Sequence, residues 1–390
     1  MEAENRSGVS ELAERAREAL KRRDPARALE LLRQAEGVGP SLDVLLDKAL
    51  ALRMLGKLTE AVEALDAALV FDPRSLLALL SKGALLERLG RPRESIFFYK
   101  AAIDVAPAGD TLPPGLAAAV ATATAAVAKS SETLAAHLAA EVADVRSRFA
   151  GESLDRFDES LEIYAGRARA FVQQPLLFHY PRLPAIPFYD RKCFPWLVDL
   201  EAASAMIREE LIALREHTIK DFVPYIAYPP GMPVNQWVEL NHSLKWSSFF
   251  LWRNGVRQAD ACVLCPMTAA LLSSLPLADQ ADHAPTAMFS VLDARTRIPP
   301  HTGSTNTRLI VHLPLVLPGP AGFRVGNVSR PWRMGEAWVF DDTIEHEAWN
   351  DADEPRTILI FDIWNPFLSE AERALVSAMM TARKAFEAKG

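Results

Sequence analysis

Two histidines in the C-terminal half of the sequence have the context of metal ligands. His301 lies in the segment PHTGSTN, which we expect to form a turn between two strands, and His346 lies in FDDTIEHEAWN, just past a predicted strand. Each imidazole can give one nitrogen to a borderline metal ion such as iron. Many iron sites take a histidine and then an acid two residues later, but Gly303 holds that second position here. A pair of histidines so far apart is weak evidence alone, so incidental histidines are the alternative.

Two predicted strands carry further polar residues among apolar ones. In RLIVHLPLVLP, side chains alternate between the two faces, so that Arg308, Ile310 and His312 share one face. Buried Arg and His need partners, which favours a lined cavity on that face over a packed core. In RTILIFDIW, Arg356 opens an apolar strand. A guanidinium at the mouth of a barrel suits a carboxylate because it presents a planar, bidentate set of donors.

The overall composition is that of a globular protein. Of the 390 residues, 49% are apolar and 24% are charged, and this length allows two or three domains with their own cores. The start of the chain lacks the apolar core of a signal peptide, and no uninterrupted apolar run reaches roughly 18 residues. We therefore expect a cytoplasmic protein without a membrane span. A net charge of −7 without basic runs argues against nucleic acid as a partner.

The chain has three cysteines, of which Cys262 and Cys265 lie close together as CVLC. Three cysteines cannot form a four-cysteine zinc site or a disulfide framework. A redox pair is the alternative, but the surrounding sequence lacks a thioredoxin-like strand and helix pattern. We interpret the two as buried or incidental thiols, and the sequence does not decide whether they bond to each other.

The first hundred residues contain a pattern that repeats every 33 to 34 positions. Small residues at equivalent positions let two helices pack closely, Gly56 and Gly90 fall between paired helices, and Pro73 and Pro107 end units. This spacing resembles tetratricopeptide repeats over residues 8 to 107. The recurring positions are Ala16, Ala28, Leu32 and Ala35, then Ala49, Ala61, Leu65 and Ala68, then Gly83, Ser95, Tyr99 and Ala102.

The rest of the chain changes character twice. An alanine-rich stretch and a further helical pattern follow the repeats and would cap them. A proline-rich segment then leads into short β-type runs separated by Gly, Pro, Asn and Asp, which indicate a sandwich or barrel rather than a parallel sheet. We expect helices at 115–149, 154–171, 200–217, 268–275 and from 369 onwards. The predicted domains are the repeats at 1–110, a helical cap and linker at 111–174 and a β domain with flanking helices at 175–390.

The motifs PHTGSTNTRLIVHLPL, GFRVGN, VFDDTIEHEAWN and RTILIFDIWNP together resemble the aspartyl/asparaginyl β-hydroxylase family of iron(II)- and 2-oxoglutarate-dependent oxygenases. The resemblance covers residues 175–368, and eukaryotic relatives also join tetratricopeptide repeats to this domain. It implies an α + β multidomain chain in which a helical solenoid precedes a double-stranded β-helix, which is a cupin-like jelly roll.

The resemblance also implies roles for the two histidines. His301 and His346 would be the iron ligands, and Gly303 would be the family's own residue, because members lack the usual carboxylate. Neighbouring acids would then support the site, although one of them reaching the metal directly or through water is left open. These acids are Asp341, Asp342, Glu345 and Glu347.

By the same resemblance, Arg356 would pair with the distal carboxylate of 2-oxoglutarate and Ser290 would assist it. His312 would lie near the carboxylate that chelates the metal, and Arg308 would face the cosubstrate or the substrate. The chain departs from many relatives at Ile310, where they carry a second arginine. That departure puts in doubt an extra anchor and an acidic peptide side chain as the substrate.

Two residues of LKWSSFFLWRNG resemble the family's substrate-side surface. Trp246 and Arg253 are candidates for the entrance to the site, and the alternatives are an aromatic core residue and a solvated strand end. The remaining histidines have no partner at a metal-binding spacing, and we interpret them as ordinary. They are His137, His179, His217, His242 and His283.

The expected function is an iron(II)- and 2-oxoglutarate-dependent dioxygenase that uses O2 to hydroxylate an aspartyl, asparaginyl or related side chain of a peptide or protein. The repeats would bind such a polypeptide on their concave surface. One alternative keeps the chemistry but takes a small molecule or lipid. Another is a repeat-protein adaptor with a degenerate barrel, and a third is a halogenase, since some halogenases also lack the carboxylate.

Overall fold

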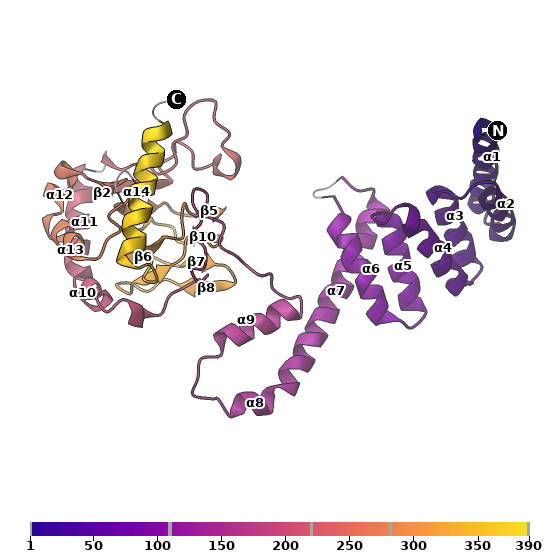
Figure 1. Cartoon of the computed structure of the whole chain (residues 1–390), viewed down its shortest axis with the longest axis horizontal. Helices are drawn as coiled ribbons and strands as arrows, with labels where there is room; N and C mark the ends of the chain where they lie inside the picture. Colours follow the sequence, from indigo (N-terminus) through magenta and orange to yellow (C-terminus); the bar gives the residue numbers. More distant parts are fainter. Residues whose placement is uncertain (1, 108–110, 219–220, 281–282, 388–390) are drawn as a thin grey trace. The chain divides into compact units, whose positions relative to one another are not determined.

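The computed structural model describes residues 2–107, 111–218, 221–280 and 283–387 (Figure 1). The chain divides after Ala168 into two compact units. The first is helical and the second contains the sheets, so the coarse prediction of a helical N-terminal part followed by a β-rich domain is confirmed. The finer division at 110 and 174 stays a prediction.

Helices α1 to α6 form three consecutive pairs, which confirms the predicted helical repeats. Ser41 and Ser75 cap the N-termini of α3 and α5, because each hydroxyl accepts a backbone N–H three residues later. Gly56 and Gly90 have positive φ angles of 76° and 73° in the turns between paired helices, where other residues would be strained. The helices are α1 (Glu2–Lys21), α2 (Pro25–Val38), α3 (Leu42–Met54), α4 (Leu58–Phe71), α5 (Leu76–Arg88) and α6 (Pro92–Val105).

Three more helices follow the repeats: α7 (Pro114–Glu141), α8 (Ala143–Ser147) and α9 (Asp155–Tyr164). The long α7 packs on α6, as expected for a cap. The prediction that the last of these helices continues to residue 171 was wrong. Helix α9 ends at Tyr164 because Gly166 takes the left-handed conformation, with a φ of 77°, that commonly terminates a helix.

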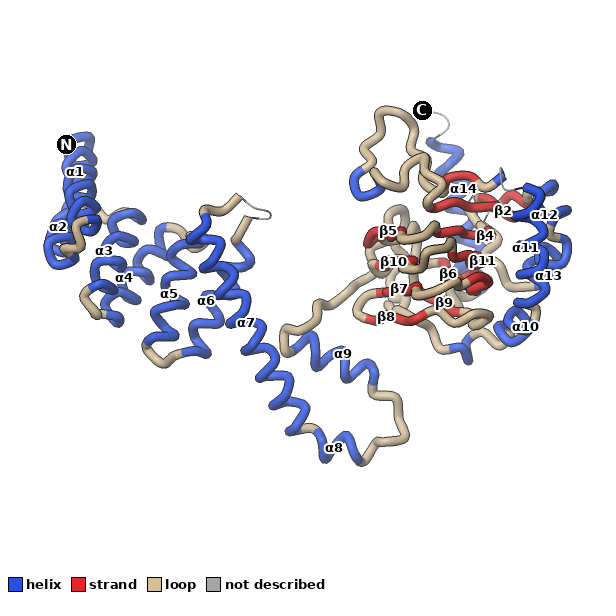
Figure 2. Tube along the Cα trace, turned by 180° about the vertical axis from the view of Figure 1, so that it is seen from behind, coloured by secondary structure: helices blue, strands red, loops and turns tan. Residues whose placement is uncertain are grey.

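The second unit contains two antiparallel sheets (Figure 2). The order of the larger is β1-β2-β4-β11-β6-β9, with β3 paired to β2, and that of the smaller is β5-β10-β7-β8. The strands of the larger are β1 (Val223–Pro224), β2 (Trp246–Arg253), β3 (Val256–Arg257), β4 (Ala287–Leu292), β6 (Arg308–Val316), β9 (Trp338–Phe340) and β11 (Arg356–Trp364). Those of the smaller are β5 (Thr296–His301), β7 (Ala321–Val325), β8 (Val328–Pro331) and β10 (His346–Asn350).

Helices cover the outer face of the larger sheet. They are α10 (Leu197–Ala202), α11 (Ser204–Thr218), α12 (Ala259–Leu264) and α13 (Pro266–Ser274), and Figure 1 shows them together beside β2. Their apolar residues and the outward side chains of β2, β4, β6 and β11 form the main core. The predicted alternation in β6 is confirmed, because Leu309, Val311 and Leu313 belong to this core. Ile310 belongs instead to a second core between the sheets.

The C-terminal helix α14 (Glu370–Glu387) begins one residue after the predicted start. Val376 and Met380 bury its apolar side against Trp364 and Leu368, which end the β domain. Two helices predicted near 200–217 and 268–275 are also present, the first as α10 and α11. Of the helices in the described ranges, none is both long enough and apolar enough to cross a membrane.

Several strands were not predicted. One of them, β5, places His301 in a strand. This residue was expected in a turn, but it is the last residue of β5, whose sequence contains Pro299 and Pro300. Proline cannot donate to a sheet ladder and is tolerated on edge strands, and β5 is an edge strand that pairs with β10. His346 was expected just past a strand and is instead the first residue of β10.

Candidate functional site

The two candidate metal ligands lie next to each other on paired strands. His346 in β10 and His301 in β5 are direct cross-strand partners, and their ring centroids are 4.0 Å apart. A bulge follows this pair, since the register shifts between His346 and Ala348. Bulges are common beside active sites because they redirect a side chain. The antiparallel pairing thus brings together two residues that are 45 positions apart in the sequence.

Both imidazoles are held in the form that a metal ligand requires. The Nδ1 atom of His301 lies 2.8 Å from the carbonyl oxygen of Pro299, and that of His346 lies 3.0 Å from the carbonyl oxygen of Ile344. Because a carbonyl only accepts, each Nδ1 must donate, which leaves the lone pair on Nε2. Burial lowers the pKa of both histidines, so the rings are neutral near pH 7.

An acidic side chain lies beside the position where the usual carboxylate is missing. The carboxylate of Asp342 fills the space that a Cβ atom on Gly303 would enter, and the Gly303 N–H donates to the Asp342 carbonyl at 2.6 Å. Burial raises the pKa of Asp342 to about 8. Within the described ranges, no three His, Cys, Asp or Glu side chains form a group that could hold a metal ion. The two histidines are therefore the candidate ligands, with Asp342 as a neighbouring group.

A buried arginine without a partner lies deeper in the site. Arg356 is 1% exposed, and its Nε and Nη1 atoms have no hydrogen-bond partner. Its guanidinium lies 5.4 Å from the centre of the Trp332 ring, and burial lowers its pKa to about 9. An unpaired buried cation is costly, so the arrangement favours an anionic ligand.

Two further predicted residues accompany this arginine. The hydroxyl of Ser290 is fully buried and accepts a hydrogen bond from Trp246 Nε1 at 3.1 Å. His312 is 6% exposed, and its Nδ1 atom has no partner. Burial lowers its pKa, and the charge of Arg356 lowers it further. The group offers one cation, a hydroxyl and a neutral imidazole, which can bind a carboxylate.

One cavity of about 290 Å³ connects the histidine pair with the buried arginine. It lies between the two sheets and opens to solvent near Leu176 and Tyr225, which are 77% and 39% exposed. Six of the sequence-predicted site residues line it, which are His301, His346, Ser290, His312, Arg356 and Trp246.

Two predicted site residues do not line this cavity. Arg308 pairs with Asp362 and donates to the carbonyl of His283 at 3.2 Å. Arg253 is exposed at the end of β2, with its guanidinium 4.8 Å from the centre of the Phe250 ring. The placement of Arg253 agrees with the alternative interpretation, a solvated strand end.

Two residues of an aromatic wall beside His301, Tyr225 and Trp237, were not predicted from the sequence, whereas the third, Trp246, was. Tyr225 and Trp246 have ring centroids 4.2 Å apart, and those of Trp237 and His301 are 5.0 Å apart. Trp237 ends a short 3-10 helix, η3 (Asn235–Trp237), within a segment rich in Pro and Gly. The sequence offered one indication of them, which is that Tyr225 and Trp237 are aromatic residues in a segment rich in Pro and Gly. No periodic pattern places them on a helix or strand.

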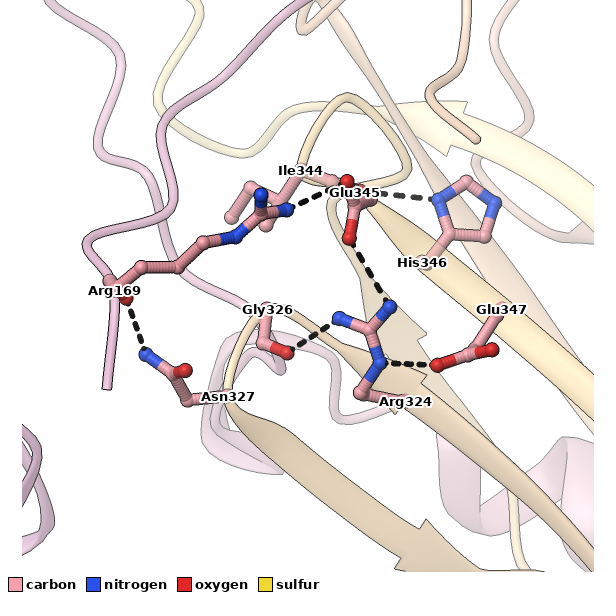
Figure 3. Close-up of polar contacts among 8 residues, drawn as sticks. All are labelled: Arg169, Arg324, Gly326, Asn327, Ile344, Glu345, His346 and Glu347. Atoms are coloured by element: carbon pink, nitrogen blue, oxygen red, sulfur yellow. Dashed lines mark hydrogen bonds and ion pairs between the residues drawn. The ribbon is translucent and has the colours of Figure 1, made fainter. Parts of the chain in front are cut away.

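A network of charges supports His346 from the outer face of the smaller sheet (Figure 3). Arg324 donates to Glu347 at 2.5 Å and to Glu345 at 3.1 Å, so it bridges the residues on either side of His346. Arg169 donates to the second carboxylate oxygen of Glu345 at 2.6 Å. Groups that fix a ligand's strand and ring orientation contribute to metal affinity.

The CVLC pair is not built for redox chemistry. Cys262 and Cys265 are free thiols, and both are buried. Burial raises the pKa of Cys265 to about 12, which leaves little reactive thiolate. Helix α12, which was not predicted, contains Cys262, whose thiol donates to the carbonyl of Leu251 in β2. The interpretation as buried thiols agrees with this placement.

Comparison with known proteins assigns both parts of the chain. Residues 201–366 match the family model described as Aspartyl/Asparaginyl beta-hydroxylase, and residues 14–75 match that of the tetratricopeptide repeat. The ornithine lipid ester-linked acyl 2-hydroxylase of Rhizobium tropici is 32% identical over 204 residues, which cover 51% of this chain and 67% of that protein. The human aspartyl/asparaginyl beta-hydroxylase is 33% identical over 214 residues, which cover 54% of this chain and 27% of that protein.

A third relative is similar to the same extent. Aspartate beta-hydroxylase domain-containing protein 2 of Xenopus tropicalis is 33% identical over 215 residues, which cover 54% of this chain and 56% of that protein. The match therefore spans less than two thirds of the length of the human and Xenopus relatives. With its repeats and this matched region, the chain belongs to the aspartyl/asparaginyl β-hydroxylase family.

Proposed function

We propose that the protein is a hydroxylase that uses iron(II), 2-oxoglutarate and dioxygen. In the overall reaction, a C–H bond of the substrate becomes C–OH, and 2-oxoglutarate becomes succinate and carbon dioxide. One atom of dioxygen enters the hydroxyl group and the other enters succinate. Bound iron supplies the redox chemistry that activates dioxygen. The residues of the chain bind and orient the reactants and exclude water.

The histidine pair fits an iron ion. Two neutral imidazoles with free Nε2 atoms are suitable ligands, and the hydrogen bonds from Nδ1 to the carbonyls of Pro299 and Ile344 hold both rings in place. His301 and His346 would hold the ion, and with only two protein ligands it would keep positions open for 2-oxoglutarate, water and dioxygen. The acidic group of Asp342 lies against Gly303, and an acid beside the histidine pair disfavours the binding of a halide there and hence the halogenase alternative.

The observation that carries the proposal is the unpaired guanidinium of Arg356 at the inner end of the same cavity. It would pair with the distal carboxylate of 2-oxoglutarate, with the Ser290 hydroxyl beside it and His312 near the end that chelates the metal. The alternative of an adaptor with a degenerate barrel is disfavoured. Such a protein would bear the cost of a buried, unpaired charge without a ligand to offset it.

We also propose that the two sheets form a double-stranded β-helix. The support is the way the chain alternates between them. Strands β4, β6, β9 and β11 lie in the larger sheet, whereas the intervening β5, β7 with β8, and β10 lie in the smaller one. This alternation places β5 and β10 opposite the strands that carry Ser290, His312 and Arg356, so the cavity is enclosed from both sides.

The names of the relatives give two kinds of substrate. The human relative is named for aspartyl and asparaginyl residues, and the Rhizobium relative for the acyl chain of a lipid. Similarity alone therefore assigns no substrate here. For the repeats we propose that a peptide or protein partner binds the groove lined by Leu46, Leu50, Arg53 and Leu77 of α3 and α5, since such repeats form concave binding surfaces.

Metal binding and cosubstrate binding test the function separately. In anaerobic titrations we expect manganese(II) to bind with a stoichiometry of one, and 2-oxoglutarate to raise the melting temperature of the loaded protein. With iron(II), ascorbate and air, the protein should convert 2-oxoglutarate to succinate. His301→Ala should abolish metal binding and succinate formation, whereas His137→Ala, at an exposed site on α7, should change neither. Wild-type protein that binds no divalent metal would refute the proposal.

A further inference from the structure

The cavity is poor in positive charge. Of the described residues that line it, Arg356 is the one arginine or lysine, and the proposed function assigns its charge to 2-oxoglutarate. Two of the histidines in the lining, His301 and His346, are assigned to the metal by the proposed function. A substrate that brought a carboxylate into the space beside the histidine pair would therefore find no second cation to bind it.

The arginine that begins β6, two residues before Ile310, is already engaged. Arg308 pairs with Asp362, whose other carboxylate oxygen accepts the backbone N–H of Thr286 at 2.8 Å. The same guanidinium donates to the carbonyl of His283. An incoming carboxylate would have to displace Asp362, which is 3% exposed, and leave that buried acid without its partner.

The floor of the cavity is aliphatic. Met288 of β4 and Ile360 of β11 are direct cross-strand partners, and Ile360 also pairs with His312 of β6. Two residues before His312, Ile310 lines the same cavity. These side chains offer no hydrogen bond to a polar group, and burying a polar group against them costs free energy, whereas burying hydrocarbon is favourable.

A further part of the lining, which begins at β2 beside β4, is aromatic. Trp246 lies between Tyr225, with ring centroids 4.2 Å apart, and Trp237, at 5.9 Å, and Trp237 continues the wall to His301. At the opening, Leu176 is 77% exposed. The cavity that reaches the histidine pair is thus lined largely by aliphatic and aromatic side chains, with Thr302 and Ser304 beside His301.

From this lining we propose that the group hydroxylated by the protein is an uncharged aliphatic chain and not a carboxylate-bearing side chain. The inference rests on the proposed function and names its substrate class. An aliphatic chain of this kind occurs as an acyl group and as the side chain of leucine. Both satisfy the lining, and the reaction balances as stated above, with one C–H bond converted to C–OH for each 2-oxoglutarate consumed.

A competition among defined probes tests the proposal on the full-length protein with iron(II), 2-oxoglutarate and air. One probe is monolauroylglycerol in mixed micelles with a nonionic carrier. The others are three capped peptides that are identical except for a central Leu, Asn or Asp. Mass spectrometry follows the gain of one oxygen atom, and succinate is measured in the same samples. We expect the lauroyl or the Leu probe to gain oxygen at least ten times faster than the Asp probe.

Each outcome has a defined meaning. Oxygen in the lauroyl probe identifies an acyl substrate, and oxygen in the Leu peptide identifies an aliphatic side chain. Preference for Asp or Asn overturns the inference, and so does the absence of oxygen from both aliphatic probes in protein that binds 2-oxoglutarate. If the protein binds no 2-oxoglutarate and makes no succinate in any sample, the proposed function itself fails.

A charged substitution in the floor gives an independent test. Ile310→Arg should reduce oxygen transfer to the aliphatic probe at least tenfold, because it places a cation where the chain lies. Binding of 2-oxoglutarate, measured by calorimetry with manganese, shows whether the variant is folded and loaded. Ile212→Arg is the matched control, since the same change falls on an exposed residue of α11 and should leave oxygen transfer unaltered. Equal rates for the two variants would contradict the inference.

Discussion

The carboxylate of Asp342 occupies the space that a side chain at Gly303 would need. The two residues are also joined by a short hydrogen bond from the Gly303 N–H to the Asp342 carbonyl. The acidic group beside the histidine pair therefore comes from the loop before β10 rather than from the position two residues after His301. This relationship gives a physical reason for glycine at 303, because any larger residue would have to displace the half-buried carboxyl group of Asp342.

The first prediction is that Gly303→Ala destabilises the fold by about 1–3 kcal/mol, the usual cost of overpacking. The added methyl group would overlap the carboxylate of Asp342. In the double variant with Asp342→Ala, most of this loss should disappear. Urea unfolding of the four proteins in a double-mutant cycle gives the coupling energy. A coupling energy near zero would show that the carboxylate moves aside freely.

The second prediction concerns the pH dependence of stability in metal-free protein. The pKa of Asp342 is about 8 when folded and near 4 when unfolded. Between these values the folded state keeps a proton that the unfolded chain has lost, so the contribution of Asp342 to the free energy of unfolding falls as pH rises from about 4 to 8. The slope is at most about 1.4 kcal/mol per pH unit.

The comparison with Asp342→Asn isolates this contribution. The amide does not titrate, so the stability of the variant relative to wild type should increase with pH across the same window and level off above about pH 8. Chemical unfolding at a series of pH values, with a chelator present, measures this difference. A constant difference between pH 4 and 8 would mean that the carboxyl group has an ordinary pKa in the folded protein.

The third prediction is that one substitution at Arg356 increases the stability of the protein and removes its response to 2-oxoglutarate. Arg356→Met should raise the stability of the ligand-free protein by at least about 1 kcal/mol, because it removes a buried cation without a partner. The same change should remove the increase in melting temperature that 2-oxoglutarate produces in wild type. Thermal unfolding with and without 2-oxoglutarate tests both parts. Arg253→Met, at an exposed site, should show neither effect, and a loss of ligand-free stability in Arg356→Met would contradict the account.

Much of this site could be predicted from the sequence because its strands have regular patterns. The period of two in β6 places His312 and Ile310 on the face opposite the leucines, and both line the cavity. Arg308 lies on the same face but pairs with Asp362, 54 positions away. No local pattern indicates that pairing, so the role expected for Arg308 stays a prediction.

Two other features could not be predicted, for physical reasons that differ. Strand β5 contains Pro299 and Pro300, which indicate a loop unless it is known that the strand lies at the edge of its sheet. The aromatic wall comes from a segment of irregular structure around Trp237, in which no hydrophobic period exists to place the side chains. Both the assignment of β5 as a strand and the placement of Trp237 depend on where other strands of the domain lie.

The fourth prediction concerns the support of His346 from the outer face of the sheet. Arg324→Met would leave Glu345 and Glu347 without the cation that bridges them. The residues on either side of His346 would then lose these side-chain contacts to β7. We expect metal affinity to fall by roughly 10- to 100-fold, as for other groups that orient a ligand. Calorimetric titration with manganese(II) gives the affinity directly.

The control for this variant is an ion pair of the same type at an exposed site. Arg295 pairs with Asp353 at 2.7 Å, and their side chains are 63% and 84% exposed. Exposed pairs contribute little to stability, so Arg295→Met should bind manganese like wild type. Equal affinities for the two variants would show that the charges around His346 do not influence the metal.

The fifth prediction separates helix propensity from packing within the repeats. Gly83 lies inside α5, where alanine would normally stabilise a helix by up to about 1 kcal/mol. A Cβ atom there would overlap the ring of Tyr99, which is 3% exposed and whose hydroxyl donates to Glu87 at 2.9 Å. Because the ring is held at both ends, Gly83→Ala should destabilise the repeats by about 1–3 kcal/mol.

Gly37 in α2 supplies the matched control, since no atom lies within 4 Å of its added Cβ. Gly37→Ala should therefore leave the repeats as stable as wild type or more so, by up to about 1 kcal/mol. Urea unfolding of the full-length protein, followed by circular dichroism of the helices, compares the two variants. If Gly83→Ala proved as stable as Gly37→Ala, the close approach of α5 and α6 would not depend on glycine. The small residues that recur with the repeat period would then need another explanation.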